Sequence, residues 1–238
     1  MKIDDTIDFY NKESDQYSKK RYEGDLLTYF QFLFRRRREL FLSLVGSITP
    51  KLKGADALEI GCADGVLIKK IFQKFPSTFE SVVGIDISEG MLETARASTH
   101  DTRASYFLRG NEPQKTFGLV IELGVHAESF EEEMKYVSGK LSPQGYFIYS
   151  AAGRNSLHAK IKLKDKKYAG DYLTYSGYEK IMNTYFDIIS SEAYGLFVPK
   201  LWAFPWLARK LQPVLEYICK PVAPSLFHEK IYLLRKKA

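Results

Sequence analysis

The stretch "ALEIGCADG", Ala57 to Gly65, decides how this chain folds and raises the question of what it binds. An apolar run that ends at Glu59 and Ile60 is followed at once by two glycines four residues apart. The pattern predicts a strand that turns sharply into a helix. Such a turn either brings the backbone close to a ligand or is simply tight, with nothing bound.

The spacing of this turn excludes two phosphate-binding loops. No Gly-Lys-Ser/Thr triplet follows Gly65, so the loop that holds nucleoside triphosphates is not expected. The dinucleotide fingerprint needs G-x-G-x-x-G, whereas this turn reads G-x-x-x-G with an acid before it and another inside it. These carboxylates would repel a pyrophosphate. A cationic cofactor removes the objection, and S-adenosylmethionine carries both a sulfonium and an ammonium group.

Length and composition indicate one folded domain. The 238 residues are 45% hydrophobic and 27% charged, which suits a single sizeable core. The two cysteines, Cys62 and Cys219, form no CxxC pair and no Cys/His cluster, so neither a disulfide framework nor a metal site is expected. The N-terminus is acidic and polar, unlike a secretory signal, and no apolar run of about 18 residues occurs. We therefore expect a cytoplasmic protein, with peripheral membrane association as an addition.

The positive charge is concentrated in the last third of the chain. Residues 159–238 carry 14 Lys/Arg against 7 Asp/Glu, while residues 1–158 carry 21 against 22. Attraction to an anionic partner is therefore expected from the C-terminal third.

Apolar runs and helical patterns alternate after residue 54, which predicts βαβ units and a parallel sheet. We expect strands near 56–60, 82–86, 105–109, 118–123 and 145–150, then two closing antiparallel strands in "DIISSEAYG" and "EKIYLLR". The fold class is α/β: a Rossmann-like doubly wound sheet of about seven strands, mostly parallel with an antiparallel last strand. One domain, 1–238, would comprise an N-terminal helical cap (1–54), a cofactor-binding core (55–150) and an acceptor-side part (151–238) with a helical insertion at about 198–226.

Local signals give helix positions. Apolar spacing from Leu26 to Ile48 predicts one long amphipathic helix, and its four consecutive arginines, 35–38, are expected on a solvated surface. Ser88 is a predicted N-cap, and capping boxes are predicted for Ser129 with Glu132 and for Ser176 with Glu179.

Two sequence segments carry a family resemblance. "LEIGCADG" together with "VVGIDISEGMLETARA" resembles the first two motifs of the class I S-adenosylmethionine-dependent methyltransferases of the small-molecule type. "FLRGNEP", "FGLVIELGVHAE" and "GKLSPQGYFIYS" resemble later segments, so the likeness covers about residues 55–150. Ala63 and Gln144 stand where the family has glycines. We expect the methyl group of Ala63 to be tolerated if the φ angle of the turn is negative.

The resemblance implies S-adenosylmethionine as cofactor and assigns roles. Asp86 would bind the ribose, as its place 21 residues beyond Gly65 also suggests. Glu59 would support the ammonium group, and a tyrosine of the N-terminal segment would fold over the cofactor. The implied cofactor-binding residues are Tyr17, Glu59, Gly61, Cys62, Ala63, Gly65, Asp86, Ile87, Met91, Asn111, Glu112, Glu122, Leu123 and Gly124.

The reaction expected is methyl transfer to a small or lipid-linked hydrophobic acceptor, with oxygen as the acceptor atom. His126, just past the fourth strand, is the candidate general base. The insertion at 198–226 mixes tryptophans with basic residues, and it either walls a hydrophobic acceptor pocket or docks on an anionic membrane surface. Its helical pieces are expected to break at Pro205 and Pro213. The alternatives are an RNA methyltransferase, although RNA has less support, and a catalytically inactive cofactor-binding accessory subunit; no DNA partner is expected.

Overall fold

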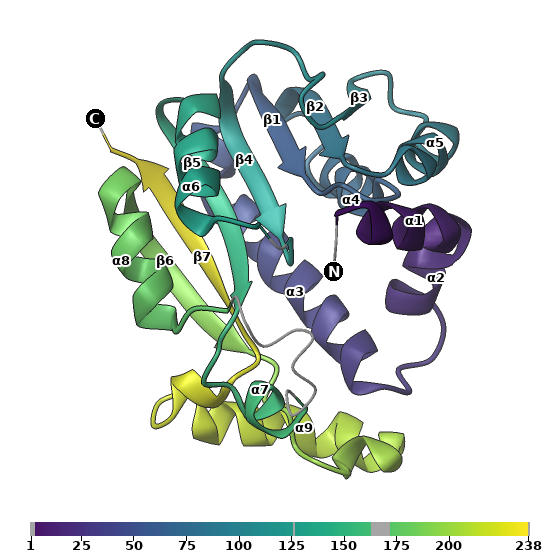
Figure 1. Ribbon diagram of the computed structural model, residues 1–238, viewed down its shortest axis with the longest axis vertical. Helices are drawn as coiled ribbons and strands as arrows, with labels where there is room; N and C mark the ends of the chain where they lie inside the picture. Colours follow the sequence, from purple (N-terminus) through teal and green to yellow (C-terminus); the bar gives the residue numbers. More distant parts are fainter. Residues whose placement is uncertain (1–2, 126, 163–171, 238) are drawn as a thin grey trace.

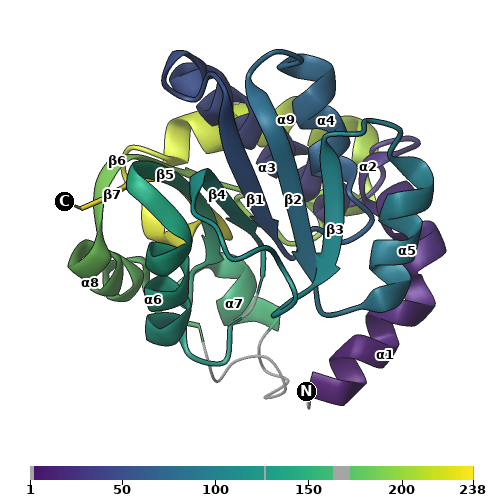
Figure 2. The same cartoon turned by 90° about the horizontal axis from the view of Figure 1, so that it is seen from above.

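The computed structural model describes residues 3–125, 127–162 and 172–237. Within these residues, the strands form one seven-stranded sheet in the order β3-β2-β1-β4-β5-β7-β6 (Figures 1 and 2). The strands are β1 (Ala55–Ile60), β2 (Phe79–Asp86), β3 (Ala104–Leu108), β4 (Phe117–Leu123), β5 (Leu141–Ala152), β6 (Phe186–Tyr194) and β7 (Glu229–Lys236).

Strand directions confirm the expected fold class. β1 pairs parallel with β2 on one side and with β4 on the other, and β3 and β5 extend the parallel part. β7 runs antiparallel to both β5 and β6, which closes the sheet at that edge. This is the Rossmann-like arrangement that the alternating pattern predicts.

Helices cover both faces of the sheet. α3 (Tyr29–Ile48), α4 (Val66–Lys74) and α5 (Glu89–Ser98) pack on one face, and α6 (Phe130–Lys140) and α8 (Tyr175–Tyr185) pack on the other. The alternation of side chains along each strand divides the two cores: in β1, Ala57 joins the first core, whereas Leu58 joins the second. The molecule is therefore three layers thick, as Figure 2 shows.

Shorter elements complete the chain. The N-terminal cap also contains α1 (Ile3–Glu13), α2 (Tyr17–Tyr22) and the single turns η1 (Ser14–Gln16) and η2 (Thr49–Lys51). The C-terminal part contains α7 (Leu157–Lys162), η3 (Leu201–Ala203), α9 (Pro205–Cys219) and η4 (Pro224–Leu226). Figure 1 shows α1 and α2 beyond the carboxyl ends of β1 and β2, and α9 at the lower end of the molecule.

The helix boundaries agree with some local signals and correct others. The hydroxyls of Ser88 and Ser129 accept hydrogen bonds from backbone amides and cap α5 and α6 as predicted. The cap of α8 is Thr174 rather than Ser176, because its hydroxyl accepts from the amide of Gly177 at 3.1 Å. Pro205 begins α9, which suits the first helical turn, but Pro213 lies inside this helix and does not break it, contrary to our expectation.

The arginine run of α3 is not a uniform solvated surface. Arg37 is buried and pairs with Glu229 of β7, to which it donates from both Nε and Nη2. Burial alone would raise the pKa of Glu229, but Arg37 and the hydroxyl of Tyr194 hold it below its usual value. Arg37 lies four residues after Leu33 and four before Phe41, both fully in the core, so it occupies the apolar stripe of the helix. That spacing was the signal that could have identified it.

We predict that Arg37→Leu lowers the free energy of unfolding by about 3–5 kcal/mol, because it leaves the Glu229 carboxylate buried without its partner. The matched control is Arg36→Leu, whose side chain is partly exposed and should cost no more than about 1 kcal/mol. Equilibrium urea unfolding measures both. The double variant Arg37→Leu/Glu229→Leu should recover part of the loss, and equal losses for the two single variants would contradict the role of the pair.

Candidate active site

The site is built where the strand order reverses. β1 lies between β2 and β4, so the connections leave it toward opposite faces and a crevice opens at the carboxyl ends of these strands. The turn after β1 fills the edge of this crevice. Its first amides, from Gly61 and Cys62, donate to the carbonyl of Ile85 at 2.8 and 3.0 Å. Gly61 has a φ angle of +69°, and a Cβ there would overlap Val125 after β4.

Asp86 fastens the turn from the end of β2. One carboxylate oxygen accepts from the amide of Ala63 at 2.9 Å, and the other accepts from the amide of Ser88 at 3.0 Å. Burial raises the pKa of Asp86 despite these hydrogen bonds. The structure therefore brings Asp86 and the glycine turn together, as the spacing predicts.

The condition under which Ala63 would be tolerated without strain is not met. Its φ angle is +47°, in the left-handed region that favours glycine, and Gln144 is also left-handed at +59°. These are the two positions where the family has glycines. The backbone conformation of both turns is thus kept, at some steric cost, without the residue that adopts it most easily.

Glu59 is the residue that points to a cationic ligand. Its side chain is buried, and Oε2 makes no hydrogen bond within the described residues. Burial, with the nearby carboxylates of Asp64 and Asp86, raises its pKa well above the ordinary value. Among the described residues no Asp, Glu, His or Cys cluster has the geometry of a metal site. Three carboxylates with one orphaned oxygen fit the ammonium and sulfonium of S-adenosylmethionine.

The N-terminal cap is attached to both loops of this crevice. Ser18 of α2 donates to Asp64 from its amide at 3.1 Å and from its hydroxyl at 2.7 Å. Asn11 of α1 accepts from the Ser88 hydroxyl at 2.7 Å and from the amide of Gly90 at 3.1 Å. Tyr17 adjoins Ser18, and its ring lies 3.8 Å from the guanidinium of Arg21. Tyr17 is therefore next to the residue that binds Asp64 of the glycine turn. Its place over the cofactor stays a prediction.

The remaining predicted residues fall into two groups. Ile87, Asn111, Leu123 and Gly124 lie partly or fully exposed at strand ends or in the loops that follow them, and Gly65 caps α4 with a positive φ angle. Met91 is packed in the core. Oε1 of Glu112 accepts from both Lys140 and Tyr136, each at 2.7 Å. Glu122 is buried beside Glu133, near the pair that Glu133 makes with Arg109. Contacts with a cofactor are thus better supported for the first group.

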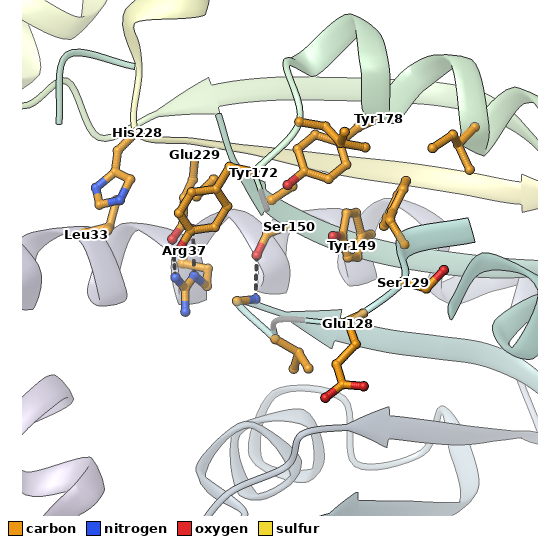
Figure 3. Close-up of a pocket in the computed structure, with 18 of the residues that line it drawn as sticks. Leu33, Arg37, Glu128, Ser129, Tyr149, Ser150, Tyr172, Tyr178, His228 and Glu229 are labelled. Carbon is orange, nitrogen blue, oxygen red and sulfur yellow. Dashed lines mark hydrogen bonds and ion pairs between the residues drawn. The ribbon is translucent and has the colours of Figure 1, made fainter. Parts of the chain in front are cut away.

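A cavity of about 500 Å³ lies beside the crevice and reaches Gly124. Figure 3 shows polar residues of this cavity, among them Arg37 of α3, Ser150 of β5 and Glu229 of β7. The hydroxyl of Ser150 accepts from the amide of Gly124 at 2.9 Å. Arg37 faces the same point, since a Cβ on Gly124 would lie 2.5 Å from its Nη1. The lining also includes two acids of the loop after β4 and the start of α6, Glu128 and Glu131, and six aromatic side chains: Phe30, Phe34, Phe130, Tyr149, Tyr172 and Tyr178.

The sequence did not reveal His228, which also lines this cavity. Its Nδ1 lies 3.2 Å from the hydroxyl of Tyr29, and its ring stacks on His158 at 4.1 Å. Burial lowers the pKa of His228 to about 3, so the ring is neutral at physiological pH. No motif surrounds it, and only the topology brings it to the cavity. The predicted base His126 lies outside the described residues.

Comparison with known proteins supports the architecture. Residues 57–145 match the methyltransferase domain family model. Malonyl-[acyl-carrier protein] O-methyltransferase from Priestia megaterium is 28% identical over 119 residues, 44% of this chain and 43% of that protein. A second such enzyme, from Ilyobacter polytropus, is 22% identical over 146 residues, 57% of this chain and 56% of its own length. The matches thus span about half the length of these curated relatives.

A solved structure resembles the whole chain. Magnesium protoporphyrin IX methyltransferase from Synechocystis PCC 6803, crystallised with bound SAH, superposes with a TM-score of 0.67 at 16% identity over 98% of both chains. The matched domain, the fold and the crevice are similar to those of class I S-adenosylmethionine-dependent methyltransferases. The Synechocystis enzyme of this fold was crystallised both with SAH and with SAM.

We predict that Glu59→Gln raises the dissociation constant for S-adenosylmethionine by about tenfold or more, because an amide cannot supply the negative charge that an ammonium group prefers. The control is Asp56→Asn, a carboxylate at the other end of β1 that pairs with Lys115 at 2.7 Å. Calorimetric titration measures both. Equal affinities for wild type and Glu59→Gln would contradict the assignment.

Proton release should accompany cofactor binding at pH values below the raised pKa of Glu59. In that range the free carboxyl is protonated, and a bound cation lowers its pKa, so binding expels the proton. Affinity should therefore rise with pH until the pKa of the free carboxyl is passed. Titrations in two buffers of different ionisation enthalpy should give different heats for wild type. The difference should shrink in Glu59→Gln.

Proposed function

We propose that this chain is an S-adenosylmethionine-dependent methyltransferase that acts on oxygen in a small or lipid-linked acceptor with an apolar body. The observation that carries the proposal is the cavity that meets the cofactor crevice at Gly124. Its aromatic side chains suit an apolar molecule, and Arg37 and Ser150 adjoin Gly124 at the crevice. The two malonyl-[acyl-carrier protein] methyltransferases act on oxygen, which supports oxygen as the acceptor atom.

The cofactor residues are proposed to act as a unit. Glu59 holds the ammonium group, Asp86 binds the ribose, and the amides of the glycine turn approach the methionine part. Ile87 and Asn111 border the adenine, and Leu123 and Gly124 lie beside the sulfur. α1 and α2 cover the cofactor through Ser18 and Asn11, within a single domain that spans the chain.

Arg37 makes one class of acceptor particularly suitable. Its guanidinium lines the cavity at Gly124 and is held in place by Glu229. An acceptor carboxylate at this point would meet a fixed cation, and because a carboxylate is ionised near neutral pH it needs no general base. A hydroxyl acceptor needs a base, and His126 remains the prediction for that case.

The chemistry asked of the protein is mainly alignment. When bound, the cofactor supplies an electrophilic methyl group on a sulfonium. The chain must hold the acceptor oxygen in line with the methyl carbon and the sulfur and exclude water, and positioning alone contributes much of the acceleration. The aromatic walls orient the acceptor, and Arg37 and Ser150 border the place that its oxygen would occupy.

The experiment is methyl transfer from labelled S-adenosylmethionine to malonyl-[acyl-carrier protein] and to a panel of apolar carboxylic acids and phenols. A carboxyl ester releases its label as methanol in base, whereas a phenol ether does not. Transfer to an acceptor of either kind supports the proposal. Cofactor binding with no transfer to any oxygen acceptor would instead favour the accessory subunit.

We predict that Ala152→Phe lowers acceptor turnover at least tenfold, because the ring fills the cavity that Ala152 lines, while cofactor affinity stays within about twofold of wild type. Ala97→Phe, at an exposed position of α5 away from the cavity, is the matched control. Steady-state kinetics and calorimetry report the two effects separately. Unchanged turnover in Ala152→Phe would place the acceptor elsewhere.

A further inference from the structure

α9 turns polar side chains toward the protein and large apolar side chains toward solvent, the opposite of an ordinary surface helix. Ala208, Gln212 and Glu216, spaced by four residues, are the buried positions of the helix. Gln212 donates from Nε2 to the carbonyl of Leu196 at 2.6 Å, and the amide of Leu196 donates to Glu216 at 2.9 Å. These inward hydrogen bonds tie α9 to the chain at Leu196, although Oε1 of Gln212 has no partner among the described residues. Several large apolar side chains of the helix lie on the outside.

These outward side chains form an unusual surface. Of the twelve exposed large apolar side chains in the described part of the chain, seven lie between residues 204 and 222. Tyr217 is 82% exposed and Trp206 is 60% exposed. We call this group the outer face of α9; its members are Phe204, Trp206, Leu211, Val214, Tyr217, Ile218 and Val222. Such a concentration of apolar surface usually marks an interaction site.

The charges around the outer face of α9 are of one sign. Residues 198–226 contain Lys200, Arg209, Lys210 and Lys220, and their single acid, Glu216, is buried. Lys220 pairs with Glu192 at 2.6 Å. The other three cations are exposed, and no ion pair with another described residue engages them. The surface therefore combines exposed apolar side chains with cations of one sign.

Three other roles fit this surface less well. None of the described residues that line the cavity comes from 198–226, so this insertion is not the pocket wall that the sequence had allowed. A second copy of the same face would set basic groups against basic groups. An RNA strand would pair its phosphates with the cations and stack bases on the exposed rings, but it would leave Val214, Ile218 and Val222 exposed to water.

We propose that the outer face of α9 docks on an anionic membrane surface. Trp206 and Tyr217 would lie at headgroup level with the aliphatic side chains beneath them. The three exposed cations of this segment would face anionic lipid. This arrangement also connects to the site. Phe227 packs under α9 with Leu215, and the next two residues along the chain, His228 and Glu229, line the cavity. The inference rests on the proposed function in one respect only: a lipid-linked acceptor would be found in the membrane on which the protein docks.

The two tryptophans allow a direct test. Trp202 is partly buried against Phe32, whereas Trp206 is exposed, so the variant Trp202→Phe leaves Trp206 as the reporter. Vesicles of phosphatidylcholine with roughly a quarter phosphatidylglycerol should shift its emission to the blue, and phosphatidylcholine alone should shift it much less. Rising salt should reverse the shift. No cofactor or acceptor is present, so this result is independent of methyl transfer.

Co-sedimentation of the full chain with the same vesicles supplies the matched variants. Trp206→Ser/Ile218→Ser should weaken binding at least tenfold, and Arg209→Glu/Lys210→Glu should weaken it on anionic vesicles. The control is Phe9→Ser/Ile189→Ser, which removes two exposed apolar residues far from α9 in sequence and should bind like wild type. Thermal melts confirm that all variants fold. Absence of binding to anionic vesicles at low salt, or a dimer that Trp206→Ser converts to a monomer, would overturn the proposal.

Discussion

The position of β1 between β2 and β4 is the constraint on which the rest of the structure depends. Because the chain leaves β1 toward one neighbour and reaches the other only later, the connecting helices lie on opposite faces and leave the carboxyl ends of these strands uncovered. The glycine turn, Asp86 and Gly124 come together there although they are distant in sequence. The cavity beside Gly124 lies at the same edge of the sheet, and residues of β5 and β7 also line it.

Two buried carboxylates show how differently the fold treats charge. Glu229 has a guanidinium and a tyrosine hydroxyl as partners, so its negative charge is retained and ties α3 to the sheet. Glu59 has carboxylates for neighbours and an oxygen with no partner among the described residues. The first arrangement is complete without a ligand. The second is unfavourable until a cation arrives, which is what a cofactor site for a sulfonium compound requires.

The sequence reveals features that repeat along the chain and conceals those that depend on distant contacts. Strand and helix alternation predicts the sheet, and the glycine turn with Asp86 predicts the crevice, because both are local patterns. His228 is not predictable, since only the antiparallel insertion of β7 brings it to the cavity. The sequence does not reveal that the φ angle of Ala63 is positive, because hydrogen bonding to Asp86 across the turn, rather than the residue itself, fixes the backbone. Similarly, α9 was expected to break at Pro213 and instead continues.

The N-terminal cap has a consequence for the rate of cofactor exchange. Four hydrogen bonds that involve Ser18 and Asn11 hold α1 and α2 against the loops of the crevice. In the proposed site the cofactor lies beneath this cap, so a spent cofactor would leave only when the cap opens. The rate at which these few contacts separate and re-form would then set an upper limit on how often the cofactor is exchanged.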